Sequence, residues 1–245
     1  MIYIANWKMH GIPSDIRKIK PVIRFLRQKK YKKVNVVYCP PYTILENFKK
    51  NLKKTNISLG AQDCNYNFNY GPFTGSINSK MIRAVGAKYV ILGHSERRNF
   101  ESNFEINKKI KSSIKINLKV IFCIGETLKE KKNKMTFKVL KKQLVNGLKD
   151  IKDLKNILIA YEPRWSIGTG SVPTSKDLLL IIKSIKNIVN SINKKQKNIT
   201  ILYGGSVNKD NVADIVKIND IKGFLVGGAS LNAKNFIDII SKSTI

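Results

Sequence analysis

Short apolar runs alternate with amphipathic helical stretches along the whole chain. Eight of these runs are rich in β-branched residues and end at polar or glycine-rich positions, a pattern typical of buried parallel strands. The predicted strands are residues 2–5, 34–38, 57–61, 89–92, 120–124, 157–161, 200–203 and 223–226. The helices predicted between them include residues 15–28, 78–85, 105–116, 137–148, 176–192 and 236–240. Thr174, three residues before Asp177, predicts a capping box at the start of the helix 176–192.

This alternation continues without a low-complexity linker or a shift in composition. Eight consecutive βα units favour a closed parallel eight-stranded α/β barrel, (β/α)8, over an open doubly wound sheet, which stays the alternative. The chain has 245 residues, of which 42% are hydrophobic, and this is enough for one large core. We therefore predict a single-domain barrel over residues 1–245.

The chain is strongly basic, with 46 Lys and Arg residues, 16 Asp and Glu residues and a formal charge of +30. Such a charge is typical of proteins that bind nucleic acid or another polyanion, but it also arises when lysines are spread over solvated faces. Aromatic residues do not interleave with lysine-rich runs such as 129–134 and 194–197, as a platform for single-stranded nucleic acid requires. Solvated faces are therefore favoured, and their positive charge would speed the arrival of an anionic substrate.

Cysteine usage indicates reduced thiols in a cytoplasmic protein. Cys39, Cys64 and Cys123 are far apart and form no CxxC motif, and with two His residues they make no metal-binding pattern. The first apolar stretch ends after five residues at Asn6, so no signal peptide is expected. No apolar run approaches membrane-spanning length.

Polar residues follow most of the predicted strands. In a closed barrel the carboxyl ends of the strands meet on one face, so these residues should be neighbours in space. They are Asn6, Lys8, Gln62, His94, Ser95, Glu96, Glu162, Gly204, Gly205, Ser206, Gly227 and Gly228. They combine an acid/base pair, a cation and two glycine pairs.

Glu162 follows the apolar run 157–161 and precedes Pro163, which cannot extend a strand. A loop with Trp165 and two glycines comes next. A carboxylate beneath a mobile loop suits a general base that must be shielded from water, whereas the simpler alternative is a carboxylate at the barrel rim.

His94 and Lys8 are the other candidate reactive groups. His94 precedes a segment that resembles a short helical turn, and a helix N-terminus would favour a neutral imidazole that donates a hydrogen bond to a carbonyl. Lys8, beside Asn6, could stabilise an oxyanion. The alternatives are a structural histidine and a lysine that faces solvent.

The glycine pairs Gly204-Gly205 and Gly227-Gly228 each follow a predicted strand and precede a helical segment. Glycine lets the backbone approach an anion closely, and the loops after strands seven and eight of such barrels frequently bind phosphate. One pair alone would indicate a turn, but two pairs on consecutive strand tips favour a phosphate site.

Most of these candidate site residues belong to seven short sequence motifs. They are Asn6-Trp7-Lys8-Met9, Gly93-His94-Ser95-Glu96-Arg97-Arg98, Cys123-Ile124-Gly125-Glu126-Thr127, Ala160-Tyr161-Glu162-Pro163, Ile167-Gly168-Thr169-Gly170, Tyr203-Gly204-Gly205-Ser206-Val207-Asn208 and Leu225-Val226-Gly227-Gly228-Ala229-Ser230-Leu231. In this order, from residue 6 to 231, the chain resembles the triosephosphate isomerase family. The resemblance implies an isomerase that interconverts dihydroxyacetone phosphate and D-glyceraldehyde 3-phosphate through an enediolate, without a metal or an organic cofactor.

The resemblance also implies a role for each site residue. Glu162 would be the base that moves a proton between two adjacent carbons, and neutral His94 would polarise the carbonyl and shuttle protons. Lys8 and Asn6 would stabilise the negative charge of the enediolate, and Glu96 would pair with the lysine. The phosphate would be bound by backbone N–H groups of Gly168, Ser206, Gly227 and Gly228.

Residues 163–172 would form a lid over the site. Arg164, Ser166 and Ser171 stand where the family usually has Val, Ala and Lys, so the lid is expected to move differently.

The family is usually a homodimer, and residues 71–76 resemble the loop that inserts into its partner. Thr74 of one subunit would then approach Asn6 and Lys8 of the other. Pro72 and Ser76 replace a usual Ala and Glu, which puts dimer stability in question. We expect a cytoplasmic, glycolytic homodimer.

Two other functions stay open at this point. The first is a polyanion or RNA binder with a weakened isomerase site, against which the joint retention of Asn6, Lys8, His94 and Glu162 argues. The second is another phosphate-handling barrel enzyme such as an aldolase. That enzyme would need a Schiff-base lysine inside the barrel, which Lys8 at the mouth fits poorly.

Overall fold

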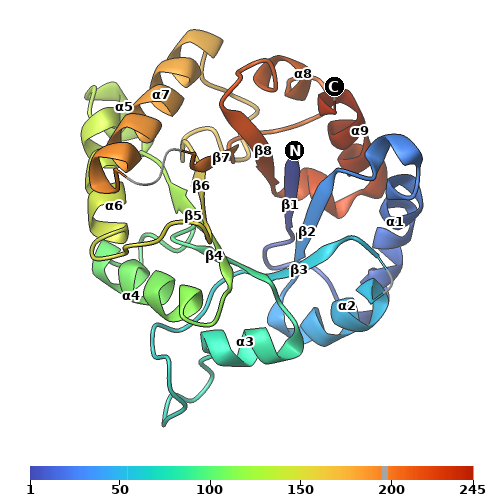
Figure 1. Ribbon diagram of the computed structural model, residues 1–245. Coiled ribbons are helices and arrows are strands. Elements are labelled where there is room, and N and C mark those ends of the chain that lie inside the picture. The colour runs from blue at the N-terminus through green and yellow to red at the C-terminus, as the bar shows by residue number, and fades with distance from the viewer. Residues whose placement is uncertain (54, 195–197, 245) are drawn as a thin grey trace.

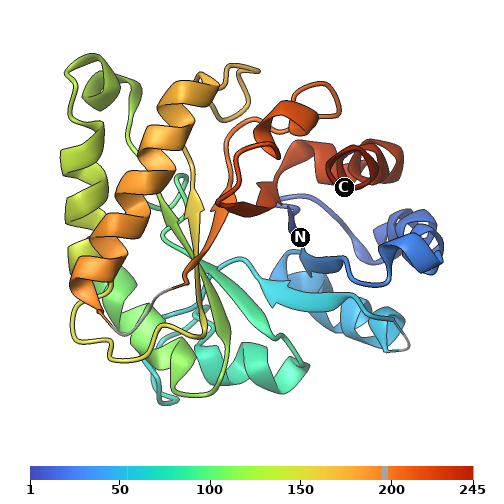
Figure 2. The ribbon, with the colours of Figure 1, turned by 45° about the horizontal axis from the view of Figure 1, so that its top comes forward.

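A closed barrel of eight parallel strands forms the centre of the molecule over the residues that the computed structural model describes, 1–53, 55–194 and 198–244. Helices surround the strands on all sides (Figure 1 and Figure 2). The strands are β1 (Ile2–Asn6), β2 (Asn35–Cys39), β3 (Ser58–Ala61), β4 (Tyr89–Leu92), β5 (Lys119–Ile124), β6 (Ile157–Tyr161), β7 (Thr200–Tyr203) and β8 (Ile221–Val226). Because β1 pairs with β8, the predicted barrel is confirmed and the open sheet is excluded.

The helices return the chain from the end of one strand to the start of the next. They are α1 (Lys20–Leu26), α2 (Leu45–Leu52), α3 (Ser79–Val85), α4 (Asn103–Ile114), α5 (Leu128–Lys132), α6 (Thr136–Gly147), α7 (Ser175–Ile192), α8 (Val212–Ile215) and α9 (Ala233–Ser243). Short 3-10 helices are η1 (Pro13–Ile19), η2 (Lys29–Tyr31), η3 (Tyr42–Ile44) and η4 (Gly228–Leu231). The lysine-rich run 194–197 lies outside the described residues from residue 195 on.

Two helix predictions are decided by local backbone chemistry. The predicted helix 15–28 is divided into η1 and α1, because Pro21 has no N–H group for a helical hydrogen bond and is tolerated only in a first turn. Thr174 Oγ1 accepts a hydrogen bond from the Asp177 N–H at 3.1 Å, which is the first half of the predicted capping box.

Alternate residues of each strand pack on opposite sides of the sheet. In β6, Leu158 and Ala160 belong to the cluster inside the barrel, whereas Ile157, Ile159 and Tyr161 pack against the helices. The strands are therefore buried on both faces, and this explains their continuous apolar sequences.

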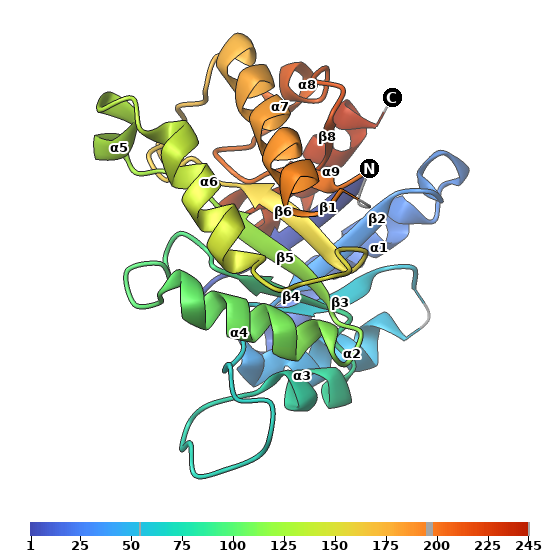
Figure 3. The same ribbon diagram turned by 60° about the vertical axis from the view of Figure 1, so that its left-hand side comes forward.

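The loop between β3 and α3 projects away from the barrel (Figure 3). Residues 71–76, which the family resemblance assigns to the subunit interface, are all exposed at its end. Asn65 Nδ2 donates a hydrogen bond to Ser76 Oγ at 3.0 Å, so Ser76 is bound within its own loop.

The ends of β5 and β6 approach so closely that only glycine fits after β5. A Cβ atom on Gly125 would lie 1.8 Å from the carbonyl oxygen of Glu162 and 2.6 Å from its carbonyl carbon. Both are main-chain atoms, which cannot rotate away. The same approach holds Glu162 at the barrel mouth, where its N–H donates to the Ile124 carbonyl at 2.7 Å.

We predict that Gly125→Ala lowers the free energy of unfolding by about 2 kcal/mol or more, because the added methyl group pushes the Glu162 backbone outward. Urea denaturation measures this change. Gly228→Ala is the control, since a Cβ there meets no atom within 4 Å and should change the unfolding free energy by less than about 1 kcal/mol. Equal stabilities of the Gly125 variant and the parent would contradict this account of the strand ends.

Candidate active site

Glu162 is a buried carboxylate at the end of β6, with 2% of its surface exposed. Its Oε1 lies 3.1 Å from His94 Nε2, and its Oε2 accepts a hydrogen bond from the Ser95 N–H at 3.3 Å. Burial raises the pKa of Glu162, but the contact with His94 outweighs that effect and the net direction is downward. The carboxylate is therefore ionised and ready to accept a proton.

His94 follows Gly93, whose φ of +69° belongs to the left-handed region, at the end of β4. The segment after it is a hydrogen-bonded turn rather than a helix, with the Arg97 and Arg98 N–H groups both donating to the His94 carbonyl. The expected helix is therefore absent, and so is the dipole that was expected to favour the neutral imidazole. Burial instead lowers the pKa of His94. Contact with Glu162 reverses this effect, so that the net pKa direction is upward.

The two imidazole nitrogens of His94 have different partners. The Glu96 N–H donates a hydrogen bond to Nδ1 at 3.3 Å, which makes Nδ1 an acceptor. In the neutral ring the proton therefore resides on Nε2, the atom that faces Glu162 and the cavity.

Lys8 adopts an unusual backbone conformation just beyond β1, with a φ of +51°. This conformation costs about 1 kcal/mol or more and persists only when neighbours hold it. Asn6 Oδ1 accepts the Lys8 N–H at 3.0 Å, and Gln62 Nε2 donates to the Lys8 carbonyl at 2.8 Å. The Lys8 Nζ is then 2.9 Å from Glu96 Oε1, so the cation points across the barrel mouth.

These groups share one cavity of about 280 Å³ at the carboxyl end of the barrel. Its walls include Asn6, Lys8, His94, Glu162, Gly168, Gly204, Gly205, Ser206, Gly227 and Gly228. Glu96 reaches the site through Lys8. Thr74 does not, because it belongs to the exposed loop outside the barrel.

The glycine pairs form a wall of the cavity beside the reactive side chains. A Cβ atom on Gly205 would lie 2.2 Å from the Tyr203 hydroxyl oxygen, and one on Gly227 would lie 3.2 Å from Lys8 Cε. The second pair is followed directly by a helix, since η4 begins at Gly228. After the first pair the helix α8 begins only at Val212, so the prediction that a helix follows each pair is correct only for the second.

The segment 163–172, which is predicted to form a lid, is anchored beside the cavity through residues that the sequence did not assign to the site. Trp165 Nε1 donates to Oε1 of buried Glu126 at 2.8 Å, and Lys131 Nζ lies 3.3 Å from the centroid of a Trp165 ring. Arg164 Nη2 donates to Asn99 Oδ1 at 2.8 Å. Glu126 stands in one of the seven motifs, whereas Asn99 and Lys131 carry no sequence signal of a lid contact.

Comparison with known proteins places this geometry in a family. A family model described as triosephosphate isomerase matches residues 1–243. The chain is 41% identical over 246 residues to a triosephosphate isomerase of Thermoanaerobacter pseudethanolicus, an alignment that covers 98% of each protein.

The chain belongs to the triosephosphate isomerase family.

Other members of the triosephosphate isomerase family agree in sequence and in structure. The enzyme of Geotalea uraniireducens is 39% identical over 249 residues, with 98% of this chain and 97% of the relative covered. The crystal structure of the triosephosphate isomerase of Bartonella henselae superposes with a TM-score of 0.89 at 33% identity and covers 98% of both chains. The predicted family, barrel and isomerase class are confirmed, and the polyanion-binding alternative is not favoured.

The described residues show neither a metal site nor a membrane-spanning helix. No group of three or more His, Cys, Asp or Glu side chains among them is arranged to hold a metal ion. Within the same residues, no helix is both long and apolar enough to cross a membrane. Cys39, Cys64 and Cys123 are buried and free, as the sequence predicts.

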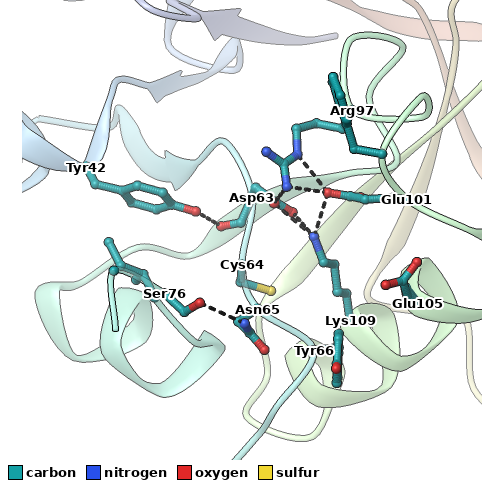
Figure 4. Close-up of a pocket in the computed structure, with 13 residues that line it drawn as sticks. Tyr42, Asp63, Cys64, Asn65, Tyr66, Ser76, Arg97, Glu101, Glu105 and Lys109 are labelled. Atoms are coloured by element: carbon teal, nitrogen blue, oxygen red, sulfur yellow. Dashed lines mark hydrogen bonds and ion pairs between the residues drawn. The ribbon is translucent and has the colours of Figure 1, made fainter. Parts of the chain in front are cut away.

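A second cavity, of about 320 Å³, lies beneath the β3–α3 loop and contains a charged cluster (Figure 4). Lys109 Nζ contacts Asp63 Oδ1 at 2.8 Å and Glu101 Oε1 at 2.9 Å, although only 6% of its side chain is exposed. Arg97 Nη2 contacts the same two carboxylates at 3.1 and 2.6 Å. The cluster ties α4 to the end of β3, and it could not be predicted because its members are distant in sequence.

We predict that Lys109→Met lowers the free energy of unfolding by about 2 kcal/mol or more at neutral pH, because it removes the ammonium from two largely buried carboxylates that then keep only Arg97 as a cationic partner. Burial raises the pKa of Asp63 and the Lys109 ammonium lowers it, so loss of that ammonium raises the Asp63 pKa further in the folded state. The folded variant then binds more protons than the unfolded chain, so its deficit should shrink as the pH falls toward 5.

The matched control is Lys111→Met on the same helix. Lys111 Nζ is 3.5 Å from Asp150 Oδ2 and its side chain is 40% exposed, so its loss should cost less than about 1 kcal/mol. Guanidinium denaturation at neutral and acidic pH measures both variants. A Lys109 variant as stable as the Lys111 variant would contradict the role of the buried cluster.

Proposed function

We propose that Glu162 is the general base of the isomerase. The reaction interconverts dihydroxyacetone phosphate and D-glyceraldehyde 3-phosphate through an enediolate, and it requires one group to take a proton from one carbon and return it to the next. Glu162 supports this role by its position, since its carboxylate is buried, ionised and faces the cavity. This buried carboxylate in contact with His94 is the observation that carries the proposal.

His94 acts as the electrophile that polarises the substrate carbonyl. Its Nε2, which carries the proton of the neutral ring, donates to the substrate oxygen once Glu162 has turned to the substrate carbon. The contact that raises the pKa of His94 is then broken, and burial, the largest influence on it, favours the neutral imidazole. The same nitrogen can move protons between the two enediolate oxygens.

Lys8 and Asn6 stabilise the negative charge of the enediolate. The held backbone of Lys8 fixes where its side chain begins, so the ammonium needs little reorganisation during the reaction. Glu96 keeps the ammonium in place through a contact of 2.9 Å.

The substrate phosphate is bound by backbone N–H groups on the glycine-rich wall. The donors are those of Gly168, Ser206, Gly227 and Gly228, all of which line the cavity. Residues 163–172 close over the bound substrate and exclude water, which protects the enediolate from loss of its phosphate.

The active form is a homodimer in the cytoplasm. A second subunit would cover the exposed loop 71–76 and two exposed apolar side chains. These are Met9, which follows Lys8 in the chain, and Phe100, which lines one cavity with Gly75 and Ser76. Thr74 of one subunit then completes the site of the other. No metal or organic cofactor takes part.

We predict that Glu162→Asp lowers kcat by about 10²-fold or more, because a shorter side chain moves the base by about 1 Å from the substrate carbon. The inhibition constant of inorganic phosphate should stay within about threefold, since the phosphate donors are unchanged. Steady-state kinetics measure both quantities.

The matched control is Glu46→Asp on α2, whose carboxylate is exposed and pairs with Lys50. It should leave kcat within about twofold of the parent value. Equal kcat values for the two variants would refute the assignment of the base.

We further predict that Phe73→Asp dissociates the homodimer, because the charge would be buried against the partner at a side chain that is 45% exposed in the single chain. The kcat/KM of the monomer should be lower than that of the dimer by a factor of roughly ten or more. Leu179→Asp, at a side chain 52% exposed on α7, should stay dimeric. Sedimentation velocity decides, and a fully active monomeric parent would contradict the dimer.

A further inference from the structure

The Ser166 hydroxyl lies at the base of the lid with no exposed surface. It stands between the lid and the glycine-rich wall that follows β7.

All hydrogen-bonding positions of this hydroxyl are occupied. Ser166 Oγ donates to the Ser171 carbonyl at 2.5 Å, across the lid. It accepts the Ser206 N–H at 3.1 Å. The Tyr203 hydroxyl, 3.4 Å away, is then the second donor to it, and burial raises the pKa of Tyr203 to about 12, which keeps that hydroxyl protonated.

The Ser206 N–H is therefore used twice in the proposed function. It is one of the donors proposed for the substrate phosphate, and in this structure it donates to Ser166 of the lid. A single N–H aligned with one acceptor cannot bind the phosphate equally well at the same time. The phosphate must displace Ser166 Oγ.

We propose that Ser166 is a positioning residue that latches the lid onto the Ser206 N–H of the proposed phosphate site. The proposal rests on the proposed binding of phosphate by Ser206. Arrival of the phosphate breaks the bond between Ser206 and Ser166, and this frees the lid segment that Ser166 holds together with Ser171. Occupancy of the phosphate site is thereby coupled to lid movement.

The latch also lowers affinity for phosphorylated ligands. Each such ligand has to replace one formed hydrogen bond, whose net strength corresponds to a factor of about two to ten in a dissociation constant. A ligand without a phosphate group leaves the latch in place and is not affected.

The test is Ser166→Ala, measured with phosphorylated and unphosphorylated ligands. KM for D-glyceraldehyde 3-phosphate and the inhibition constant of inorganic phosphate should both fall about two- to tenfold. The kcat/KM for unphosphorylated D-glyceraldehyde should stay within about twofold, a difference that general damage to the fold would not produce. An unchanged or higher KM for the phosphorylated substrate overturns the latch, as does an equal effect on both substrates.

Ser191→Ala is the matched control, because it also removes one hydroxyl that donates to a carbonyl. Ser191 Oγ donates to the Ile188 carbonyl at 2.7 Å on α7, outside the lid and the cavity. The KM for D-glyceraldehyde 3-phosphate should therefore change by less than about twofold. A fall in KM equal to that of Ser166→Ala would overturn the role of the Ser166 hydroxyl.

A measurement on the unaltered enzyme covers the case in which Ser166→Ala does not fold. Hydrogen exchange of the Ser206 amide should be slow without ligand, because its N–H is bonded to Ser166. Exchange at the rate of an unprotected amide overturns the latch. If the parent does not interconvert triose phosphates, the proposed function itself fails. If the parent is active and the Ser166 variant has the same kinetics as the parent, only the latch is rejected.

Discussion

The contact of 3.1 Å between His94 Nε2 and Glu162 Oε1 joins the ends of two strands across a third. The two residues follow β4 and β6, which are not neighbours, and β5 lies between them. A buried carboxylate is costly unless it is hydrogen-bonded, and here the imidazole and the Ser95 N–H provide the partners. The same contact keeps the carboxylate ionised and the imidazole oriented.

Small and strained backbone positions bring these groups together. Gly125 allows the ends of β5 and β6 to touch, and Lys8 holds a left-handed conformation with support from Asn6 and Gln62. Such strain persists at functional sites when the surrounding structure compensates for it. The +30 charge of the chain surrounds a site that attracts an anion, so arrival of substrate should be faster at low ionic strength.

Sequence patterns predicted the strands better than the contacts between distant segments. The bounds 89–92, 157–161 and 200–203 agree with β4, β6 and β7, because doubly buried strands are apolar throughout and stop at Gly93, Glu162 and Gly204. The helices α2, α5 and α8 were not among the predicted ones, and α5 and α8, with five and four residues, give too little periodicity. The sequence could not predict the ion pairs of Lys109 with Asp63 and Glu101 or the hydrogen bond between Ser206 and Ser166. The partners in these contacts are 8 to 46 positions apart, and only the fold joins them.

The central claim is that Glu162, His94 and Lys8 surround one small phosphorylated ligand. A crystal structure with 2-phosphoglycolate, whose carboxylate resembles the enediolate, tests it most directly. The account predicts the phosphate on the N–H groups of Ser206, Gly227 and Gly228, and the ligand carboxylate within hydrogen-bond distance of His94 Nε2 and Lys8 Nζ. A ligand bound instead in the cavity beside Lys109, or with its carboxylate turned away from His94, would contradict it.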